Sequence, residues 1–588
     1  MACKKYSGSD RKREEHGNMA RTVAIGYQNY QELIERNAFY IDKTLFIKEW
    51  WENIDKVTLI TRPRRFGKTL NMSMVEQFFS VDYAGQGRLF ERMKIWKEEK
   101  YRQIQGTYPV ISLSFAPVKS MKNFADTRHL LCRLIYEQYN KYRFLLDVDG
   151  LMDEKEKALF CAVSRDMDED IAAMSLNMLS KLLMKQYGKK VIILLDEYDT
   201  PMQEAYVNGY WDALVAFITN LFHLTFKTND CLERAILTGI TRVSKESIFS
   251  DLNNLEVVTT TQNKYEDTFG FTQEEVSEAL KEFGLSDMEE GVRDWYDGFT
   301  FGNKSDLYNP WSIIHYLDKK RFSTYWVNTS SNNLVSKLIC EGSADVKVTM
   351  EDLLNGGTLR TNIDEQIVFS QLDYSENAIW SLLLASGYLK VEKHLFDVES
   401  GKEMYDLKLT NKEVRLMFQN MIEGWFKDYS PAYNDFVKAL LQGDIDAMNE
   451  YMNIVARDTF SNFDTGRHAS EKYQPERFYH GFVLGLLVDL SDRYVITSNR
   501  ESGFGRYDVM LEPRKGNEKD DAVIIEFKVH RFRREKDLEE TVKAALAQID
   551  SKGYAAELIS RGVSPERIRK YGFAFEGKDV LIGTPEID

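Results

Sequence analysis

The sequence predicts an α/β protein with a parallel sheet towards its amino terminus and a separate α/β domain at its carboxyl terminus. Three stretches carry this prediction. An apolar run at 57–60 leads through a Gly-Lys-Thr turn into a helix, and a second apolar run at 191–195 ends in Asp-Glu. Near the carboxyl terminus, two short runs at 507–511 and 522–528 combine apolar with charged residues. Short apolar runs bounded by turn residues indicate strands, and helical periodicity between them indicates an α/β architecture.

The length and composition indicate a multidomain globular chain. Its 588 residues exceed the size at which one hydrophobic core keeps growing, so we expect roughly three or four domains. With 43% hydrophobic and 13% aromatic residues, the chain can bury several cores. The 92 acidic and 77 basic residues leave a net charge of −15, which argues against coating nucleic acid through overall charge. A local basic channel is compatible with this balance.

The cysteines and the apolar runs bear on the cellular compartment. The five cysteines form no C-x-x-C pair, which argues against a disulfide framework and a zinc site and fits a reducing environment. No apolar run approaches the ~18 residues of a membrane span, and residues 1–21 lack the apolar core of a signal peptide. We therefore expect a cytoplasmic protein without a membrane segment.

The turn after the first apolar run has the properties of a phosphate-binding loop. Unpaired N–H groups at the start of a helix, together with the helix dipole, attract phosphate oxygens. We expect Arg65, Phe66 and Gly67 to line a bound nucleotide. Lys68 would reach the β and γ phosphates, and the Thr69 hydroxyl would bind Mg²⁺.

The loop departs from the usual spacing at one position. In G-x-x-x-x-G-K-[ST] the first glycine falls where this chain has Arg62, so three of the four defined positions match. A chance Gly-Lys-Thr in a basic turn is the alternative. Residues further along the chain are needed to distinguish a phosphate-binding loop from a chance match.

The run at 191–195 supplies the carboxylates that such a loop needs. Its apolar residues predict a strand buried on both faces of a parallel sheet, with Asp196 and Glu197 at the carboxyl edge where ligands bind. We expect Asp196 to hold Mg²⁺, and Glu197 to orient and deprotonate the water that attacks the γ phosphate. The combination favours an ATP site.

Two further features near this site leave alternatives open. Arg242 follows a third strand at 234–240 and could contact the γ phosphate, or could be a surface or capping arginine. The aromatic residues of 25–30 and 39–44, ahead of the loop, could stack on adenine or could belong to the core.

The middle of the chain carries less chemistry. Thr272 and Glu275 form a capping-box pattern that predicts a helical subdomain from about residue 265. Residues 330 to about 465 are expected to be helical with some short strands and to connect two domains. The expected divisions are a tail at 1–20, the phosphate-loop domain at 21–264, the helical subdomain at 265–330, a mostly helical connector at 331–469 and the carboxyl-terminal domain at 470–588.

The strands of the carboxyl-terminal domain predict a second metal site. Side chains two apart share a face of a strand, so Glu526 and Lys528 point the same way while Phe527 enters the core. Asp508 lies on the strand joined to theirs by a hairpin. Two carboxylates and the Phe527 carbonyl suit Mg²⁺ or Mn²⁺. A metal there would activate water and stabilise charge on a scissile phosphate, and Lys528 would position the nucleophile.

The alternative is a Glu-x-Lys pair on a solvated strand face. Residues 522–525 are apolar at every position, which favours a buried strand whose terminal charges need a partner. Glu476, on a helix from about 475, is a further candidate metal ligand. The basic run at 528–536 could follow a phosphate backbone or form a solvated loop.

Together these stretches resemble a large bacterial family with an AAA-ATPase-like domain. The resemblance lies in 39–44, 62–69, 195–199 and 237–242. In that family an arginine recurs in place of the first loop glycine. Its members typically end in a nuclease-like domain of the PD-(D/E)xK type, which the order of elements from 470 onwards resembles. The implied fold is a P-loop NTPase of the additional-strand type, then a helical subdomain and connector, then a PD-(D/E)xK α/β domain.

The resemblance implies an ATP-binding and ATP-hydrolysing protein that controls a metal-dependent nuclease, with nucleic acid, DNA in first place, as substrate. Asp508, Glu526 and Lys528 match the catalytic positions of the nuclease domain, although Tyr507 replaces the proline that gives the motif its name. The alternative is a nucleotide-dependent signalling or scaffold ATPase whose carboxyl-terminal domain binds a partner or nucleic acid without cutting. The oligomeric state is left open, with a homo-oligomer among the options.

Overall fold

The computed structural model divides the chain into two compact units. The first contains residues 1–240 and 245–323, and the second contains 241–244 and 324–588. The structure describes residues 20–242, 248–249, 252–327, 333–340, 344–364, 375–397, 401–427, 430–459, 483, 487, 490, 493–502, 505–517, 519–530, 535–576 and 578–585.

The first unit is built on a five-stranded sheet in which every neighbouring pair is parallel. Its strands are β1 (Val57–Thr61), β2 (Val110–Ser114), β3 (Val191–Asp196), β4 (Leu232–Gly239) and β5 (Leu255–Val258). Their order is β2-β3-β4-β1-β5, so β4 lies between the strand before the phosphate loop and the strand that ends in Asp196. This additional-strand arrangement confirms the predicted fold class.

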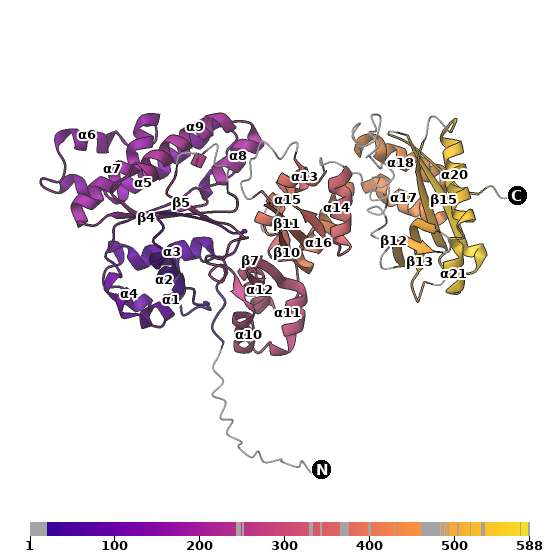
Figure 1. Ribbon diagram of the computed structural model, residues 1–588, viewed down its shortest axis with the longest axis horizontal. Helices are drawn as coiled ribbons and strands as arrows, with labels where there is room; N and C mark the ends of the chain where they lie inside the picture. The colour runs from indigo at the N-terminus through magenta and orange to yellow at the C-terminus, as the bar shows by residue number, and fades with distance from the viewer. Residues whose placement is uncertain are drawn as a thin grey trace, which may run out of the picture. The chain divides into compact units, whose positions relative to one another are not determined.

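Helices cover both faces of this sheet (Figure 1). One face carries α1 (Tyr30–Glu35), α2 (Leu45–Glu52), α3 (Lys68–Phe79) and α4 (Glu99–Ile104). The other carries α5 (Phe124–Lys141), α6 (Glu154–Ala162), α7 (Glu169–Tyr187), α8 (Thr200–Asn208) and α9 (Trp211–Phe222). Because both faces are covered, every residue of β1 and β3 is buried.

Two of the aromatic side chains ahead of the phosphate loop, Tyr30 and Phe39, belong to the core. Tyr30 is fully buried and stacks on Phe90, with ring centroids 5.1 Å apart. Phe39 is also buried and meets Phe283 edge-on at 5.3 Å. Packing, and not adenine stacking, therefore accounts for these two side chains.

The first unit continues into a smaller subdomain of helices around a three-stranded sheet. We call it the β6–α12 subdomain; it contains β6 (Phe271–Thr272), α10 (Gln273–Glu282), α11 (Glu289–Tyr296), β7 (Asp297–Phe301), β8 (Lys304–Tyr308) and α12 (Pro310–Lys319). The strand order is β6-β8-β7. The predicted capping box is present, with Thr272 and Glu275 each accepting the other's backbone N–H.

The second unit begins with helices and an antiparallel sheet of order β10-β11-β9. These elements are α13 (Asn333–Cys340), α14 (Ala344–Leu354), β9 (Leu359–Thr361), α15 (Glu376–Ala385), β10 (Leu389–Asp397), β11 (Lys402–Leu409) and α16 (Lys412–Lys427). At nine and eight residues, β10 and β11 are longer than the short strands expected here. Charged residues on the exposed face of this hairpin interrupt the apolar runs that would reveal it.

The second unit ends in a five-stranded sheet between two layers of helices (Figure 1). Its strands are β12 (Tyr494–Ser502), β13 (Gly505–Pro513), β14 (Ala522–Val529), β15 (Ile568–Glu576) and β16 (Asp579–Gly583), in the order β12-β13-β14-β15-β16. Only β14 and β15 are parallel to each other among these neighbouring pairs. The two described helices that join β14 to β15 are α20 (Leu538–Ser551) and α21 (Ala555–Ser560).

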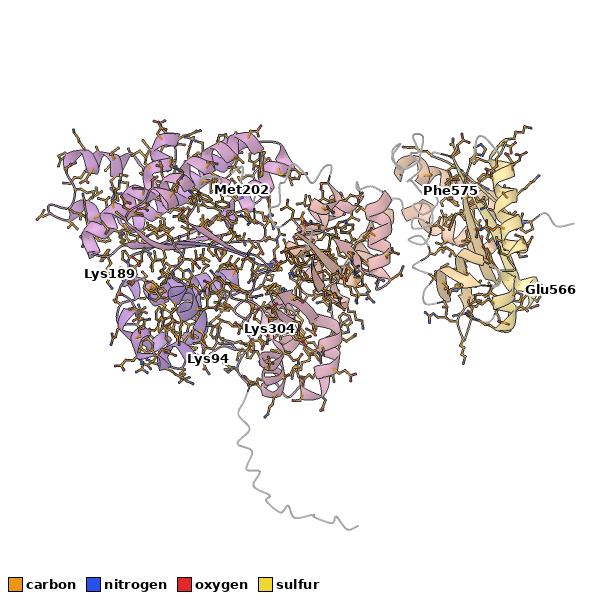
Figure 2. All side chains as sticks on the ribbon, viewed as in Figure 1. Lys94, Lys189, Met202, Lys304, Glu566 and Phe575 are labelled. Atoms are coloured by element: carbon orange, nitrogen blue, oxygen red, sulfur yellow. The ribbon has the colours of Figure 1, made fainter. Side chains whose placement is uncertain are left out.

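Two helices from the stretch expected to be a connector share the core of this sheet. They are α17 (Ser430–Gln442) and α18 (Ile445–Thr459), and they lie on the face opposite α20. Phe436 and Met452 join Phe527 and Phe575 in one buried cluster. Phe575 is labelled in Figure 2.

Helix α18 also covers the edge of the sheet. The amide of Asn449 donates to the Ile582 carbonyl at 2.9 Å and accepts from the Ile582 N–H at 2.7 Å. Asn453, one turn later, makes the same pair of hydrogen bonds with Val580, at 2.7 Å and 2.9 Å. Two side chains therefore pair with the edge strand β16 much as a further strand would.

Candidate functional site

The phosphate loop turns sharply between β1 and α3. Arg65 and Gly67 both have left-handed backbone conformations, with φ of 67° and 81°, and at Gly67 the absence of a Cβ makes this conformation inexpensive. Lys68 follows as the first residue of α3 and is 7% exposed. Its Nζ donates to the carbonyl oxygens of Arg62 at 2.8 Å and Pro63 at 2.9 Å.

The ammonium group of Lys68 is enclosed by the loop and faces acidic residues. Burial lowers the pKa of Lys68 below its ordinary value, and the carboxylates of Asp196, Glu197 and Asp199 oppose this effect. The cation thus lies at the strand edge that carries the predicted carboxylates.

Thr69 and Asp196, which the sequence assigns to the same magnesium ion, lie in direct contact. The Thr69 hydroxyl donates to Asp196 Oδ2 at 2.6 Å across 127 residues of chain. The other carboxylate oxygen, Oδ1, accepts from the Thr238 hydroxyl and, at 3.0 Å, from the Glu197 N–H. Sequence reasoning missed Thr238. Its signal was a hydroxyl at the end of β4, the strand that separates β1 from β3.

The donor set at this point fits a nucleotide-bound magnesium ion. A hydroxyl and a carboxylate are hard oxygen ligands, which Mg²⁺ prefers in combination with phosphate oxygens and water. Thr69 and Asp196 could hold such an ion, and Lys68 could bind the phosphates.

Glu197 stands directly beside this pair in a strained conformation. Its φ is +51°, which is uncommon for a residue with a side chain. Its carboxylate accepts from the Thr200 hydroxyl at 3.2 Å. The turn therefore fixes the backbone of Glu197 at the carboxyl end of β3, the position predicted for a group that orients water.

Asp199, which the sequence did not single out, ties the ends of two strands together. It is 1% exposed and accepts from the Ile240 N–H at 3.0 Å. A Cβ at Gly239 would lie 2.7 Å from an oxygen of Asp199, so this close approach requires glycine. Asp199 has a structural role beside the loop.

Arg62, which replaces the first loop glycine, is fully buried. Its guanidinium donates to the carbonyl oxygens of Thr259 at 2.7 Å and Lys264 at 3.1 Å. The guanidinium carbon lies 4.6 Å from the ring centroid of Phe301. Burial lowers the pKa of Arg62 to about 9, so the group stays charged at neutral pH. The arginine thus binds backbone carbonyls of the segment that follows β5.

The side chains of Arg65 and Phe66 contact the β6–α12 subdomain. Phe66 is 1% exposed and lies 4.7 Å from Phe299, ring to ring. The exposed guanidinium of Arg65 lies 4.3 Å from the ring centroid of Trp311. The predicted nucleotide contacts of these two residues would therefore come from their backbone N–H groups.

Arg242 follows β4 at the third position after Gly239 and is half-buried. By its contacts it belongs to the second unit. Its role at the γ phosphate stays a prediction.

In the carboxyl-terminal sheet, Gln548 joins two of the predicted catalytic residues. Glu526 is 2% exposed, and its Oε1 accepts a hydrogen bond from the Gln548 amide nitrogen. The Lys528 ammonium donates to the amide oxygen of Gln548 at 2.7 Å. Glu526 and Lys528 therefore face α20 together, as the strand alternation predicts, while Phe527 packs on Phe573 at 5.4 Å. Two charged residues on a buried strand need hydrogen-bond partners, and Gln548 is a partner of both. This contact favours the buried strand over the solvated strand face.

The other predicted ligands can be placed only in part. Asp508 is part of β13, and the residue after it, Val509, pairs with Ile525 of the antiparallel strand β14. Asp508 precedes Val509 and Glu526 follows Ile525, so the two residues occupy the next position of the same strand pair. The side chain of Asp508 and all of Glu476 lie outside the described residues. Among the described side chains, no group of three or more His, Cys, Asp or Glu residues could hold a metal ion.

The basic run after β14 is also described only at its ends. Residues 531–534 lie outside the described part of the chain. His530 is 7% exposed, and its Nδ1 lies 2.9 Å from the Thr541 hydroxyl, which donates to Glu535. His530 therefore packs against α20 and is not part of a solvated basic loop.

In the described residues, no helix has both the length and the apolar character that crossing a membrane requires.

Comparison with known proteins finds one similar protein along the chain and two matching families. The chain is 23% identical over 577 residues to a protein of Azotobacter chroococcum mcd 1 described as an uncharacterized protein in the vnfD 5' region. The similarity covers 95% of this chain and 98% of that protein. Residues 24–249 match the family model described as a predicted AAA-ATPase, and residues 474–584 match that of the PD-(D/E)XK nuclease superfamily. The chain thus carries an AAA-ATPase-like domain followed by a domain of the PD-(D/E)XK nuclease superfamily.

Proposed function

We propose that the protein binds and hydrolyses ATP and thereby controls a metal-dependent nuclease domain in the same chain. The favoured substrate of this nuclease is DNA. The observation that carries the proposal is the presence in one chain of two assembled charge constellations. One is Lys68 beside the Thr69–Asp196 contact at the phosphate loop. The other is the Glu526–Gln548–Lys528 chain on a PD-(D/E)XK sheet.

At the first constellation each side chain has a distinct task. Lys68 binds the β and γ phosphates, and Thr69 and Asp196 hold the magnesium ion. Magnesium, when bound, neutralises charge on the phosphates. Glu197, at the carboxyl end of β3, would accept the proton of the attacking water molecule. Arg242 contacts the γ phosphate from the segment after β4.

At the second constellation the carboxylates and the lysine divide the work. Asp508, Glu526 and the Phe527 carbonyl hold a Mg²⁺ or Mn²⁺ ion, with Glu476 as a further ligand. The ion, when bound, lowers the pKa of water and stabilises charge on the scissile phosphate. Lys528 holds the water for attack, and Gln548 orients both Lys528 and Glu526 through its amide.

A cleavage panel tests the proposal. Linear double-stranded DNA, single-stranded DNA and RNA are incubated with the full chain in Mg²⁺ or Mn²⁺, with and without ATP. We expect wild-type protein to cut in a metal-dependent way, and Glu526→Ala and Lys528→Ala to lose about 10²-fold or more of this activity. Glu197→Gln is expected to bind ATP without hydrolysing it and to lock cleavage at its ATP-bound level. Glu539→Ala, which changes an exposed carboxylate of the same domain, is the matched control.

Two outcomes would contradict the proposal in different ways. Undiminished cleavage by Lys528→Ala would remove the second constellation from the reaction. No cleavage with any metal or substrate, combined with Lys68-dependent ATP binding that changes the assembly state, would identify a scaffold or signalling ATPase instead.

A further inference from the structure

The phosphate loop is held from outside by the β6–α12 subdomain. Asn309, the N-cap of α12, uses both ends of its side-chain amide. Its Oδ1 accepts from the Trp311 N–H at 2.9 Å and caps the helix. Its Nδ2 donates to the carbonyl oxygen of Arg64, in the middle of the loop, at 3.2 Å. One side chain thus joins a helix start in the subdomain to the backbone of the loop.

The two residues after Arg64 also contact the same subdomain. The Arg65 guanidinium lies over Trp311 at 4.3 Å, the first residue of α12 after Pro310. The Phe66 ring lies 4.7 Å from Phe299 and 5.2 Å from Phe301, both on β7. Three consecutive loop residues are therefore held by elements that follow them by more than 200 residues.

The contact with Asn309 has a direct consequence for phosphate binding. A trans peptide group is planar, so its N–H points away from its carbonyl oxygen. Fixing the Arg64 carbonyl towards Asn309 therefore fixes the Arg65 N–H in the opposite direction. Backbone N–H groups that converge in this way form the anion-binding concavity of a phosphate loop. The subdomain sets the direction of a donor that the phosphates need.

We propose that Asn309 is a positioning residue for the nucleotide, and that the β6–α12 subdomain and the bound nucleotide stabilise each other through the phosphate loop. This proposal rests on the proposed function in that it requires nucleotide at the loop. By linkage, whatever holds the loop in its binding conformation raises the affinity for ATP, and ATP in turn stabilises the subdomain.

A substitution can separate the two roles of Asn309. Serine keeps an oxygen that caps α12, but its side chain is too short to reach the Arg64 carbonyl. Asn309→Ser should therefore preserve the helix and lose the loop contact. Asn123 is the matched control, because it caps α5 through the Asp126 N–H at 2.9 Å in the same unit, and Asn123→Ser makes the same change away from the loop.

ATP binding with Mg²⁺ to the full chain is measured by calorimetry for wild type, Asn309→Ser, Asn123→Ser and Lys68→Ala. We expect Asn309→Ser to bind about fivefold more weakly, which corresponds to the loss of roughly one hydrogen bond. Asn123→Ser should bind as wild type does. In hydrogen exchange, ATP should protect the amides of 298–312 in wild type and protect them less in Asn309→Ser.

The outcomes separate the two proposals. If wild type binds ATP through Lys68 but Asn309→Ser binds equally well, Asn309 does not position the nucleotide. If ATP leaves exchange at 298–312 unchanged in wild type, the subdomain is not coupled to the loop, a result that needs no variant to fold. If wild type binds no ATP, or Lys68→Ala binds it as tightly, the proposed nucleotide site fails and the inference fails with it.

Discussion

Arg62, which replaces the first glycine of the phosphate-loop motif, has a structural role. Its guanidinium is buried, donates to carbonyl oxygens at 2.7 Å and 3.1 Å, and lies against an aromatic ring. A buried charge is costly without hydrogen bonds, and here both Nη nitrogens donate to backbone carbonyls, whereas the buried Nε has no hydrogen-bond partner among the described residues. The position that usually allows a close phosphate approach here anchors the loop to the segment after β5.

Restoring the motif glycine should therefore harm the protein. Arg62→Gly would leave several buried carbonyls without donors and open a cavity, so we expect the first unit to lose about 3 kcal/mol or more of stability. Thermal unfolding of the full chain, with and without ATP, measures this loss. Arg62→Lys keeps the charge but not the forked donor geometry, so its stability should lie between that of wild type and that of Arg62→Gly. A glycine variant as stable as wild type with tighter ATP binding would contradict the structural role of Arg62.

Asp297, at the start of β7, should make the stability of the first unit depend on pH. Burial first, and then the neighbouring Asp306 carboxylate, raise the pKa of Asp297 from its ordinary value of 3.8 to about 6. The folded state therefore binds the proton more tightly than the unfolded state. The resulting stability is fully present below about pH 4 and is lost as pH rises through about 6.

Asparagine resembles the protonated form of this side chain. We expect Asp297→Asn to raise the melting temperature at pH 7.5, by the equivalent of about 2 kcal/mol, and to change it little at pH 3.5. Melting temperatures of both proteins at the two pH values test this. An equal difference at both pH values would show that the charge of Asp297 is not responsible.

At the scale of elements, α18 acts as a substitute strand for the edge of the carboxyl-terminal sheet. Asn449 and Asn453 are four residues apart, so they lie on one helix face about 6 Å apart along the axis. Alternate residues of a strand are spaced about 6.6 Å apart. The two periods agree closely enough for both amides to pair with β16.

Removing this pairing should expose a sheet edge. The double variant Asn449→Ala/Asn453→Ala loses four hydrogen bonds, so we expect a loss of about 2–4 kcal/mol and concentration-dependent association. Chemical denaturation and sedimentation velocity measure the two effects. Lys438→Ala, at an exposed side chain on α17, is the control. A double variant that unfolds and sediments like wild type would show that the asparagines do not protect the edge.

At the scale of the molecule, α17 and α18 extend the nuclease-superfamily domain beyond the residues that match its family. The match begins at residue 474, whereas the buried cluster on one face of the sheet includes Phe436, Met448 and Met452. Val483, Leu487 and Leu490, inside the match, belong to the same cluster, so without α17 and α18 this face of the sheet would lose part of its cover.

Two fragments test where this domain begins. We expect residues 430–588 to unfold cooperatively, and residues 474–588 to aggregate or remain partly folded because the sheet exposes apolar side chains. Circular dichroism and limited proteolysis compare the two. Cooperative unfolding of residues 474–588 would show that the domain does not require α17 and α18 to fold.

Local sequence patterns predicted the strands that carry the sites, but they did not predict contacts between residues far apart in the chain. Strands β1, β3 and β14 each contain a run of buried apolar residues, because helices cover both faces of their sheets, and such runs can be recognised in the sequence alone. The sequence assigned Thr69 and Asp196 to the same magnesium ion, and the structure places the two side chains in direct contact. Arg62 could not be assigned, since its partner Thr259 is 197 residues away. The asparagines of α18 carry no pattern that distinguishes them from surface residues.

The position of β1 in its sheet has a consequence for how the first unit folds. This strand comes first in the chain, yet its two neighbours, β4 and β5, begin only at residues 232 and 255. Pairing over such separations is slow, because a long loop must close before any contact rewards it. During synthesis, β1 has no strand to pair with until most of the unit has left the ribosome. Acquisition of nucleotide affinity by a refolding chain would therefore report completion of the whole sheet, and a chain interrupted before β4 would have no working phosphate loop.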